Sequence, residues 1–334
     1  MDQLDEPRSV PTDPAATDRA LTRRGALLGG AGVAATSLAL AALPGTARAD
    51  GGRAGGRAED DVDLQPVPVP PQVPATEGEV SFGAGSLWYW DTGGSGEPIV
   101  LMHAASGSGA SWVYQQPVFA QAGYRVIGYS RRGHRNSDAG TGDPGTFADD
   151  LNALVEHLQL PRVHLVGTAL GSIGAADYLL SFPDRVISAA LTCSLVTLGD
   201  ADYLARSNAL RPQPQWSTLP PEFQELGPSY RAMNPEGVAA WKREQALAPS
   251  PTLLQRTRTP VTAAALSGAR APILLATGDA DLYTPPAMLR ELGRAIPNAR
   301  QVIFTDSGHN AYWERPTLFN RTVLEFIRRS RGRR

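Results

Sequence analysis

The stretch that decides the fold is residues 163–174, which read VHLVGTALGSIG. The apolar run 163–166 predicts a buried strand, a tight turn follows at 167–171, and the residues after it are compatible with a helix. A strand, a sharp turn and a helix in this order form the setting in which the pattern Gly-x-Ser-x-Gly exposes a nucleophilic serine. In this sequence the central position is Ala169, whose methyl group cannot attack a substrate.

Short β-type runs alternate with helical patterns from about residue 80 onward, which predicts the α/β class with a mainly parallel, doubly wound sheet of about eight strands. An opening hairpin is expected over EVSF and SLWYWD. The inner strands are expected over 98–103, 124–129, 163–168, 186–192, 272–278 and 300–305. Most of these runs are continuously apolar, as strands that are buried on both faces are.

Residues 198–267 interrupt the alternation, because they contain several helical stretches and no clear strand. Ligands of open α/β sheets bind at the carboxyl ends of the strands. An insertion between two strands is therefore expected to form a helical lid over the site. The alternative is a helical appendage that packs elsewhere.

The N-terminus has the features of an export signal. Arg23 and Arg24 precede a Gly/Ala/Leu-rich run at 25–43, and an A-x-A pattern ends at Ala49. This is typical of a twin-arginine-type signal over 1–49, and it predicts a periplasmic or extracellular protein. A membrane anchor is the alternative, which the glycines in the run disfavour.

The segment that follows is rich in glycine and then in proline. Such composition predicts a linker over 50–78, and the α/β domain is expected over 79–334.

Composition limits the function further. The chain has 334 residues, 42% of them hydrophobic, and a net charge of −2, so a large core is expected and bulk charge indicates no nucleic acid partner. The single Cys193 excludes an intramolecular disulfide. The sequence shows no phosphate loop, metal-ligand cluster or dinucleotide fingerprint, so we expect no cofactor and no metal. The expected partner is a small-molecule substrate, with no membrane contact once the signal is cleaved.

Two polar residues follow the last two predicted strands. Asp281 lies in GDADLYTPP and His309 lies in DSGHNAYWERP. A nucleophile position, an acid and a histidine in this order are typical of a catalytic triad. Asp281 would accept a hydrogen bond from one ring nitrogen of His309 and leave the other as a base. Asp279 and Asp306 are the alternative acids.

Together these motifs resemble the α/β-hydrolase superfamily over roughly 80–330. The motifs are HAASGSGASW (103–112), YSRRGHRNSD (129–138), GTALGS at the turn, GDADLYTP at the acid and GHNAYWERP at the histidine. The resemblance implies an α/β-hydrolase fold and an oxyanion hole made by the backbone N–H groups of Ala105 and Leu170.

The sequence departs from the family pattern at Ala104 and Arg135, where glycine is usual, and at Ser130, where aspartate is usual. At Ala169 the family has Ser, Asp or Cys.

Neighbouring hydroxyl groups are poor replacements for the missing nucleophile. On a sharp turn neither Thr168 nor Ser172 projects where residue 169 does. The spacing of the other candidate serines marks none of them as a nucleophile; these are Ser106, Ser108, Ser130 and Ser194. Cys193 lies in an apolar run and is predicted to be a small buried side chain.

Three interpretations of Ala169 remain. In the first, His309 and Asp281 act without covalent catalysis as a hydrolase or lyase, and His309 deprotonates water or an acidic C–H or O–H group. In the second, the chain is a ligand-binding member without turnover. In the third, it is a Ser-to-Ala variant of an ordinary serine esterase. The presence of both Asp281 and His309 favours the first.

The expected substrate is a small apolar ester, lactone or activated carbonyl compound. Four aromatic residues flank the predicted site and are expected either to form its apolar walls or to pack in the core: Trp112, Tyr283, Tyr312 and Trp313.

Overall fold

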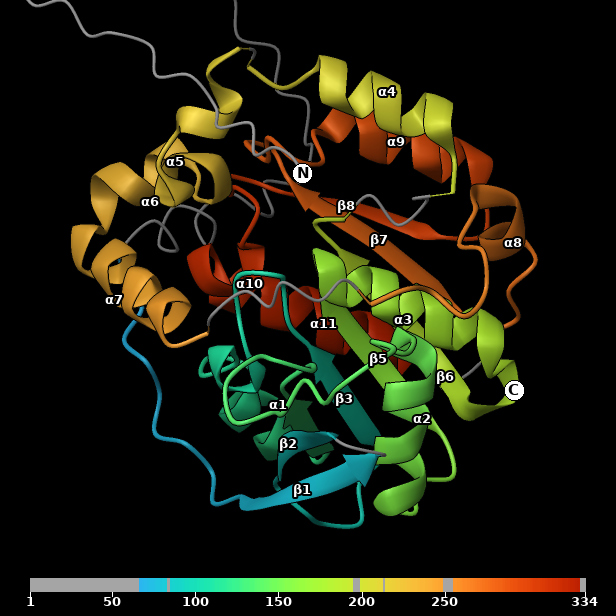
Figure 1. Cartoon of the computed structure of the whole chain (residues 1–334). Helices are drawn as coiled ribbons and strands as arrows, with labels where there is room; N and C mark the ends of the chain where they lie inside the picture. The colour runs from blue at the N-terminus through green and yellow to red at the C-terminus, as the bar shows by residue number, and fades with distance from the viewer. Residues whose placement is uncertain (1–65, 83–84, 195–198, 213, 249–254, 331–334) are drawn as a thin grey trace, which may run out of the picture. The chain divides into compact units, whose positions relative to one another are not determined.

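The structure is a computed structural model, and it describes residues 66–82, 85–194, 199–212, 214–248 and 255–330. The predicted export signal at 1–49 and the first part of the predicted linker, 50–65, lie outside these ranges. The described part is an α/β fold in which helices cover both faces of one eight-stranded sheet (Figure 1). This confirms the predicted fold class.

The sheet has the strand order β1-β2-β4-β3-β5-β6-β7-β8. The pairs β1–β2 and β2–β4 are antiparallel, and all other neighbouring strands are parallel. The strands are β1 (Thr76–Phe82), β2 (Gly85–Asp91), β3 (Pro98–Met102), β4 (Arg125–Tyr129), β5 (Val163–Thr168), β6 (Val186–Thr192), β7 (Ile273–Gly278) and β8 (Arg300–Phe304). Their carboxyl ends therefore meet along one edge of the sheet from β3 to β8.

Two hydrophobic clusters fill the space between the sheet and its helices. Apolar side chains of α2 (Phe147–His157), α3 (Leu170–Ser181) and α9 (Pro286–Ala295) belong to one cluster. Those of α1 (Gln116–Gln121) and α11 (Pro316–Ser330) belong to the other. In α11, Phe319, Val323 and Ile327 recur every four residues and form a single buried stripe.

The insertion between β6 and β7 is helical in its described residues. It contains α4 (Ala201–Ala209), α5 (Pro221–Glu225), α6 (Pro228–Met233), α7 (Pro235–Ala246) and α8 (Ala263–Ser267), together with the short 3-10 turn Gln215–Thr218. Prolines begin α5, α6 and α7, where the missing N–H group costs no helical hydrogen bond. The carbonyl group of Glu225 accepts the N–H of His309 at 2.7 Å, so the insertion packs as a lid on the loop after β8.

No helix in the described ranges is long and apolar enough to cross a bilayer.

The domain begins earlier than the sequence predicts. Strand β1 starts at Thr76, three residues before the expected boundary at 79. The extended residues before it are also attached to the domain: the carbonyl of Val67 accepts the Tyr114 hydroxyl at 3.1 Å, and the N–H of Val73 donates to the Gln116 side chain at 3.0 Å. Residues 66–75 therefore form an arm that is docked on the domain. An extended proline-rich segment makes no internal hydrogen bonds, so its backbone groups can bind a neighbouring part of the chain.

The packing of α3 on β3 predicts a strong effect of Gly171→Ala. A Cβ atom at Gly171 would lie 2.0 Å from the carbonyl oxygen of Met102 and 2.7 Å from that of His103. Backbone on both sides must move, so we expect the free energy of unfolding to fall by about 3 kcal/mol, measured by urea denaturation. Gly268→Ala is the control, since its Cβ would meet nothing closer than 3.5 Å. Equal unfolding midpoints for the two variants would contradict this packing.

Candidate active site

The turn between β5 and α3 is made by a single residue. Ala169 has φ 49° and ψ −119°, a conformation that costs a non-glycine residue about 1–3 kcal/mol. Its N–H donates to the carbonyl of Thr192 at 2.9 Å, which ties the turn to the end of β6. Close approach is possible only because Gly167 lacks a side chain, whose Cβ would lie 2.7 Å from the Cα of Ser172. The chain keeps the sharp turn of a nucleophile elbow with alanine at its centre.

The structure brings Asp281 and His309 together at the carboxyl ends of β7 and β8. The Nδ1 atom of His309 lies 2.9 and 3.0 Å from the two carboxylate oxygens of Asp281. Asp281 also accepts the N–H groups of Tyr283 and Thr284 and the hydroxyl of Thr277, at 2.8–2.9 Å. Because an ionised carboxylate only accepts, Nδ1 carries the proton. Within the described ranges nothing bonds to Nε2 of His309, which is left as the base.

Each member of the pair stabilises the charge of the other. Burial alone would raise the pKa of Asp281, but the charge and hydrogen bond of His309 hold this pKa below its usual value. Burial also opposes the charge of His309, yet the Asp281 carboxylate outweighs it and raises the pKa of His309. The pair is therefore suited to accept a proton at His309.

The alternative acids have other partners. Asp279 accepts the N–H groups of Asp306 and Ser307 at 3.0 and 3.2 Å, and Asp306 accepts the Ser229 hydroxyl at 3.1 Å. These two carboxylates hold the loop that carries His309, and Asp281 is the acid in contact with the imidazole.

The loop after β3 is fixed by a buried histidine. The N–H of Arg131 donates to Nε2 of His103 at 3.0 Å, so Nδ1 carries the proton and donates to the carbonyl of Ala104 at 2.7 Å. Burial, reinforced by the charge of Arg131, lowers the pKa of His103 well below its usual value, which keeps the ring neutral. The carbonyl of Ala104 also accepts from the Arg131 guanidinium at 3.1 Å. This fixes the backbone immediately before Ala105.

The two predicted oxyanion donors are Ala105 and Leu170. Ala105 is exposed, and Leu170 is the first residue of α3, whose N–H has no partner within the helix. In the described part of the chain the N–H of Ala105 donates to no backbone carbonyl. The start of α3 also favours negative charge.

Among the described residues, no Ser, Thr or Cys side chain hydrogen-bonds to His309. The Ser172 hydroxyl donates to the carbonyl of Thr192 and accepts its N–H, both at 2.9 Å, so Ser172 joins α3 to β6. Cys193 is fully buried, and burial raises the pKa of its thiol well above the usual value. Four further hydroxyls are buried: Ser108, Ser130, Thr168 and Ser194.

A lid carboxylate that the sequence does not mark also reaches the site. Oε2 of Glu225 accepts the Ser106 hydroxyl at 2.8 Å and the Asn310 amide at 3.0 Å. Ser106 follows Ala105 and Asn310 follows His309, so Glu225 lies between the two functional loops. No sequence pattern indicates this, since its partners are 119 and 85 residues away.

Glu314 joins the lid to the loop after β8 that carries His309. Its buried carboxylate accepts the N–H groups of Gly308 and Asn310 at 3.0–3.1 Å and that of Gly227 in the lid at 2.7 Å. Burial raises the pKa of Glu314 to about 7, although these N–H groups act against the shift.

Of the four predicted wall residues, Tyr283 contacts the catalytic pair: its ring lies 4.5 Å from the imidazole of His309. The others are 1–4% exposed and belong to the hydrophobic core: Trp112, Tyr312 and Trp313. Trp112 packs on Tyr312 at 4.8 Å. These three side chains fill the core beneath the lid.

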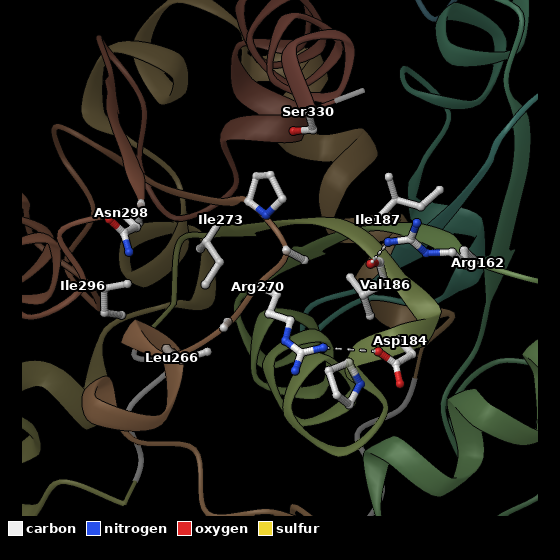
Figure 2. A pocket seen from close by; sticks show the side chains of 15 residues that line it. Arg162, Asp184, Val186, Ile187, Leu266, Arg270, Ile273, Ile296, Asn298 and Ser330 are labelled. Atoms are coloured by element: carbon white, nitrogen blue, oxygen red, sulfur yellow. Dashed lines mark hydrogen bonds and ion pairs between the residues drawn. The ribbon is translucent and has the colours of Figure 1, made fainter. Parts of the chain in front are cut away.

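A groove of about 640 Å³ lies at the other end of the sheet (Figure 2). Val186 and Ile273, the first residues of β6 and β7, line it. Its ion pair, Arg270 with Asp184 at 3.9 Å, is almost fully exposed and therefore weak. Because His309 and Asp281 lie at the carboxyl ends of the strands, this groove is not part of their site.

In the ranges that the structure describes, no group of three or more His, Cys, Asp or Glu residues could hold a metal ion.

The position of Glu225 predicts an effect on His309. The acidic groups that raise the pKa of His309 are Asp281, Glu225 and Glu314. Glu225→Gln removes one of these negative charges, so we expect the pKa of His309 to fall. The measurement is a pH titration of the His309 ring C–H signal by NMR, assigned with His309→Gln.

Glu222→Gln is the matched control, because Glu222 lies on the same helix and pairs with Lys242 at 2.8 Å. It is expected to leave the His309 titration unchanged. A Glu225→Gln protein whose His309 titrates as in the native chain would show that the carboxylate does not act on the imidazole.

Comparison with known proteins agrees with the fold. The profile of the "Alpha/beta hydrolase family" matches residues 99–322. A 2-hydroxy-6-oxononadienedioate/2-hydroxy-6-oxononatrienedioate hydrolase of Burkholderia vietnamiensis is 30% identical over 72% of this chain and 90% of its own length.

Two solved structures share the fold. A thermophilic esterase from Thermogutta terrifontis has a TM-score of 0.65 at 22% identity and covers 77% of this chain and 99% of its own. A bromoperoxidase from Bacillus anthracis has a TM-score of 0.61 at 23% identity and covers 76% and 100%. The chain belongs to the alpha/beta hydrolase family.

Proposed function

We propose that the protein is a hydrolase or lyase for small esters, lactones or activated carbonyl compounds, and that it works without a covalent acyl-enzyme. One observation carries the proposal: the Asp281–His309 pair is complete, while the elbow presents the methyl group of Ala169. The hydrolase and esterase among the similar proteins support a small carbonyl compound as substrate.

In the proposed hydrolysis, Nε2 of His309 takes a proton from water as the water oxygen bonds to the substrate carbonyl carbon. The carbonyl electron pair moves to oxygen, and the N–H groups of Ala105 and Leu170 bind the resulting anion. Asp281 stabilises the imidazolium. When the tetrahedral intermediate collapses, the bond to the leaving group breaks and the leaving group takes the proton from His309. A substrate with an acidic C–H or O–H group would give that proton to Nε2 directly.

The rate that is lost without a nucleophile indicates which substrates the protein can turn over. In a serine protease, loss of the nucleophile costs about a million-fold, and about 10³–10⁴-fold over water remains. Ordinary unactivated esters should therefore react slowly here. Substrates whose reaction needs only a positioned base and an anion-binding site lose far less, which favours activated carbonyl compounds.

Comparison of three proteins on a panel of esters, lactones and β-diketones tests the proposal: the native chain, His309→Ala and Ala169→Ser. Loss of the base is expected to reduce turnover about 100-fold or more. Ala169→Ser is expected to gain esterase activity with a burst of acyl-enzyme, because it restores the nucleophile at the elbow. Steady-state rates and burst kinetics are the measurements.

His157→Ala is the control, since His157 is exposed on α2. Turnover that survives unchanged in His309→Ala would refute base catalysis. Saturable binding of panel compounds with no turnover by the native chain would instead identify a ligand-binding member of the family.

A further inference from the structure

A lid arginine lies beside the catalytic pair. Arg211 follows α4 and is half-buried. Its guanidinium carbon lies 5.3 Å from the ring centre of Tyr283 and 5.5 Å from that of Trp216. The Tyr283 ring in turn packs on the imidazole of His309 at 4.5 Å. One aromatic ring therefore separates this guanidinium from the catalytic base.

The Arg211 side chain has no acceptor among the described residues, and its buried Nε is unsatisfied. Every other described arginine that is not exposed has a carboxylate or carbonyl partner. These are Arg125, Arg131, Arg132, Arg135, Arg185, Arg231, Arg300 and Arg315. Arg211 is thus the exception within the part of the chain that the structure describes.

The environment of Arg211 is costly for a cation. Arg211 is half-buried, so water is partly withdrawn from the guanidinium, and this burial lowers its pKa. Cation–π contact with two aromatic rings offsets part of the free energy lost when water leaves the guanidinium. It gives no hydrogen-bond acceptor to the N–H groups. A carboxylate matches the guanidinium with two parallel, charge-assisted hydrogen bonds.

The carboxylates of the protein near this site are already engaged. Asp281 is bound to His309, and Glu225 accepts from Ser106 and Asn310. Neither has a hydrogen bond or ion pair with Arg211 in the described ranges. A ligand carboxylate would supply the acceptor that the described residues do not.

We propose that Arg211 binds a carboxylate of the substrate, so that the protein acts on small carbonyl compounds that also carry a carboxylate group. The proposal rests on the proposed function, because it assigns the substrate class of the same site. The substrate carboxylate lies against the guanidinium at the lid, and the aromatic face of Tyr283 lies between it and His309.

Titration of the full chain with benzoate and with its neutral analogue benzamide tests the proposal by calorimetry. The native protein is expected to bind benzoate saturably and about tenfold or more tighter than benzamide. Arg211→Gln should weaken benzoate by about tenfold or more and leave benzamide unchanged. Arg211→Lys, which keeps the charge and loses the bidentate geometry, should lie between the two.

Arg206→Gln is the matched control, because Arg206 lies on α4 and is paired with Glu291. Equal benzoate affinity in the native chain and Arg211→Gln overturns the proposal, as does an equal loss in Arg206→Gln. Circular dichroism and the unchanged benzamide affinity show that the variants are folded.

Kinetics separate this proposal from the proposed function. Arg211→Gln should raise KM for phenyl hydrogen succinate with little change in kcat, and its loss of kcat/KM should be about tenfold larger for this ester than for the neutral phenyl acetate. If the native chain turns over no compound of the ester, lactone and β-diketone panel, the proposed function fails, whereas the benzoate titration still decides whether Arg211 is an anion site.

Discussion

The structure of the site depends on how closely α3 begins against the carboxyl ends of β3, β5 and β6. Gly167 and Gly171 allow this contact, since a Cβ on either would overlap neighbouring backbone. Ala169, midway between them, makes the turn with a positive φ, and its N–H donates to the carbonyl of Thr192. The first N–H groups of α3 consequently face the edge of the sheet where His309 and Asp281 are placed. A looser start of α3 would separate these groups even if every side chain were kept.

Charge around His309 is arranged mainly by acidic groups. Asp281 contacts the ring, Glu225 comes from the lid, and Glu314 binds the loop from below. All three raise the pKa of His309, so together they favour the imidazolium that base catalysis produces. Arg211 is a lid cation within the influence of Asp281, and in the described ranges it forms no ion pair with any of these acids. The site therefore combines a stabilised imidazolium with a separate positive group for a ligand.

The sequence predicts the parts of this site that depend on local pattern. Apolar runs predict the inner strands, and Asp281 and His309 are found because each directly follows one of them. The lid helices appear as a gap in the strand alternation.

Glu225 is not predictable in this way, since its carboxylate is identified only by contacts with distant loops. The docked arm at 66–75 is missed for the same reason, because its proline-rich composition resembles a linker and its partners are Gln116 on α1 and Tyr114 in the loop before that helix. Trp112 and Trp313 show the opposite error. Both lie near the catalytic motifs in the sequence, but sequence position does not tell whether an aromatic side chain lines a pocket or packs in the core.

The strained turn at Ala169 can serve the site without a nucleophile. An alanine with φ 49° lowers folding stability by about 1–3 kcal/mol, and its methyl group takes no part in the chemistry. What the conformation does provide is backbone geometry: it turns the chain from β5 directly into α3 and presents the N–H of Leu170 at the start of that helix. In the mechanism we propose, this is the group that binds the developing anion, and it is unaffected by the identity of side chain 169. The strain lowers folding stability, while the conformation it maintains places a backbone donor for the transition state, so the turn has a role that does not depend on a serine.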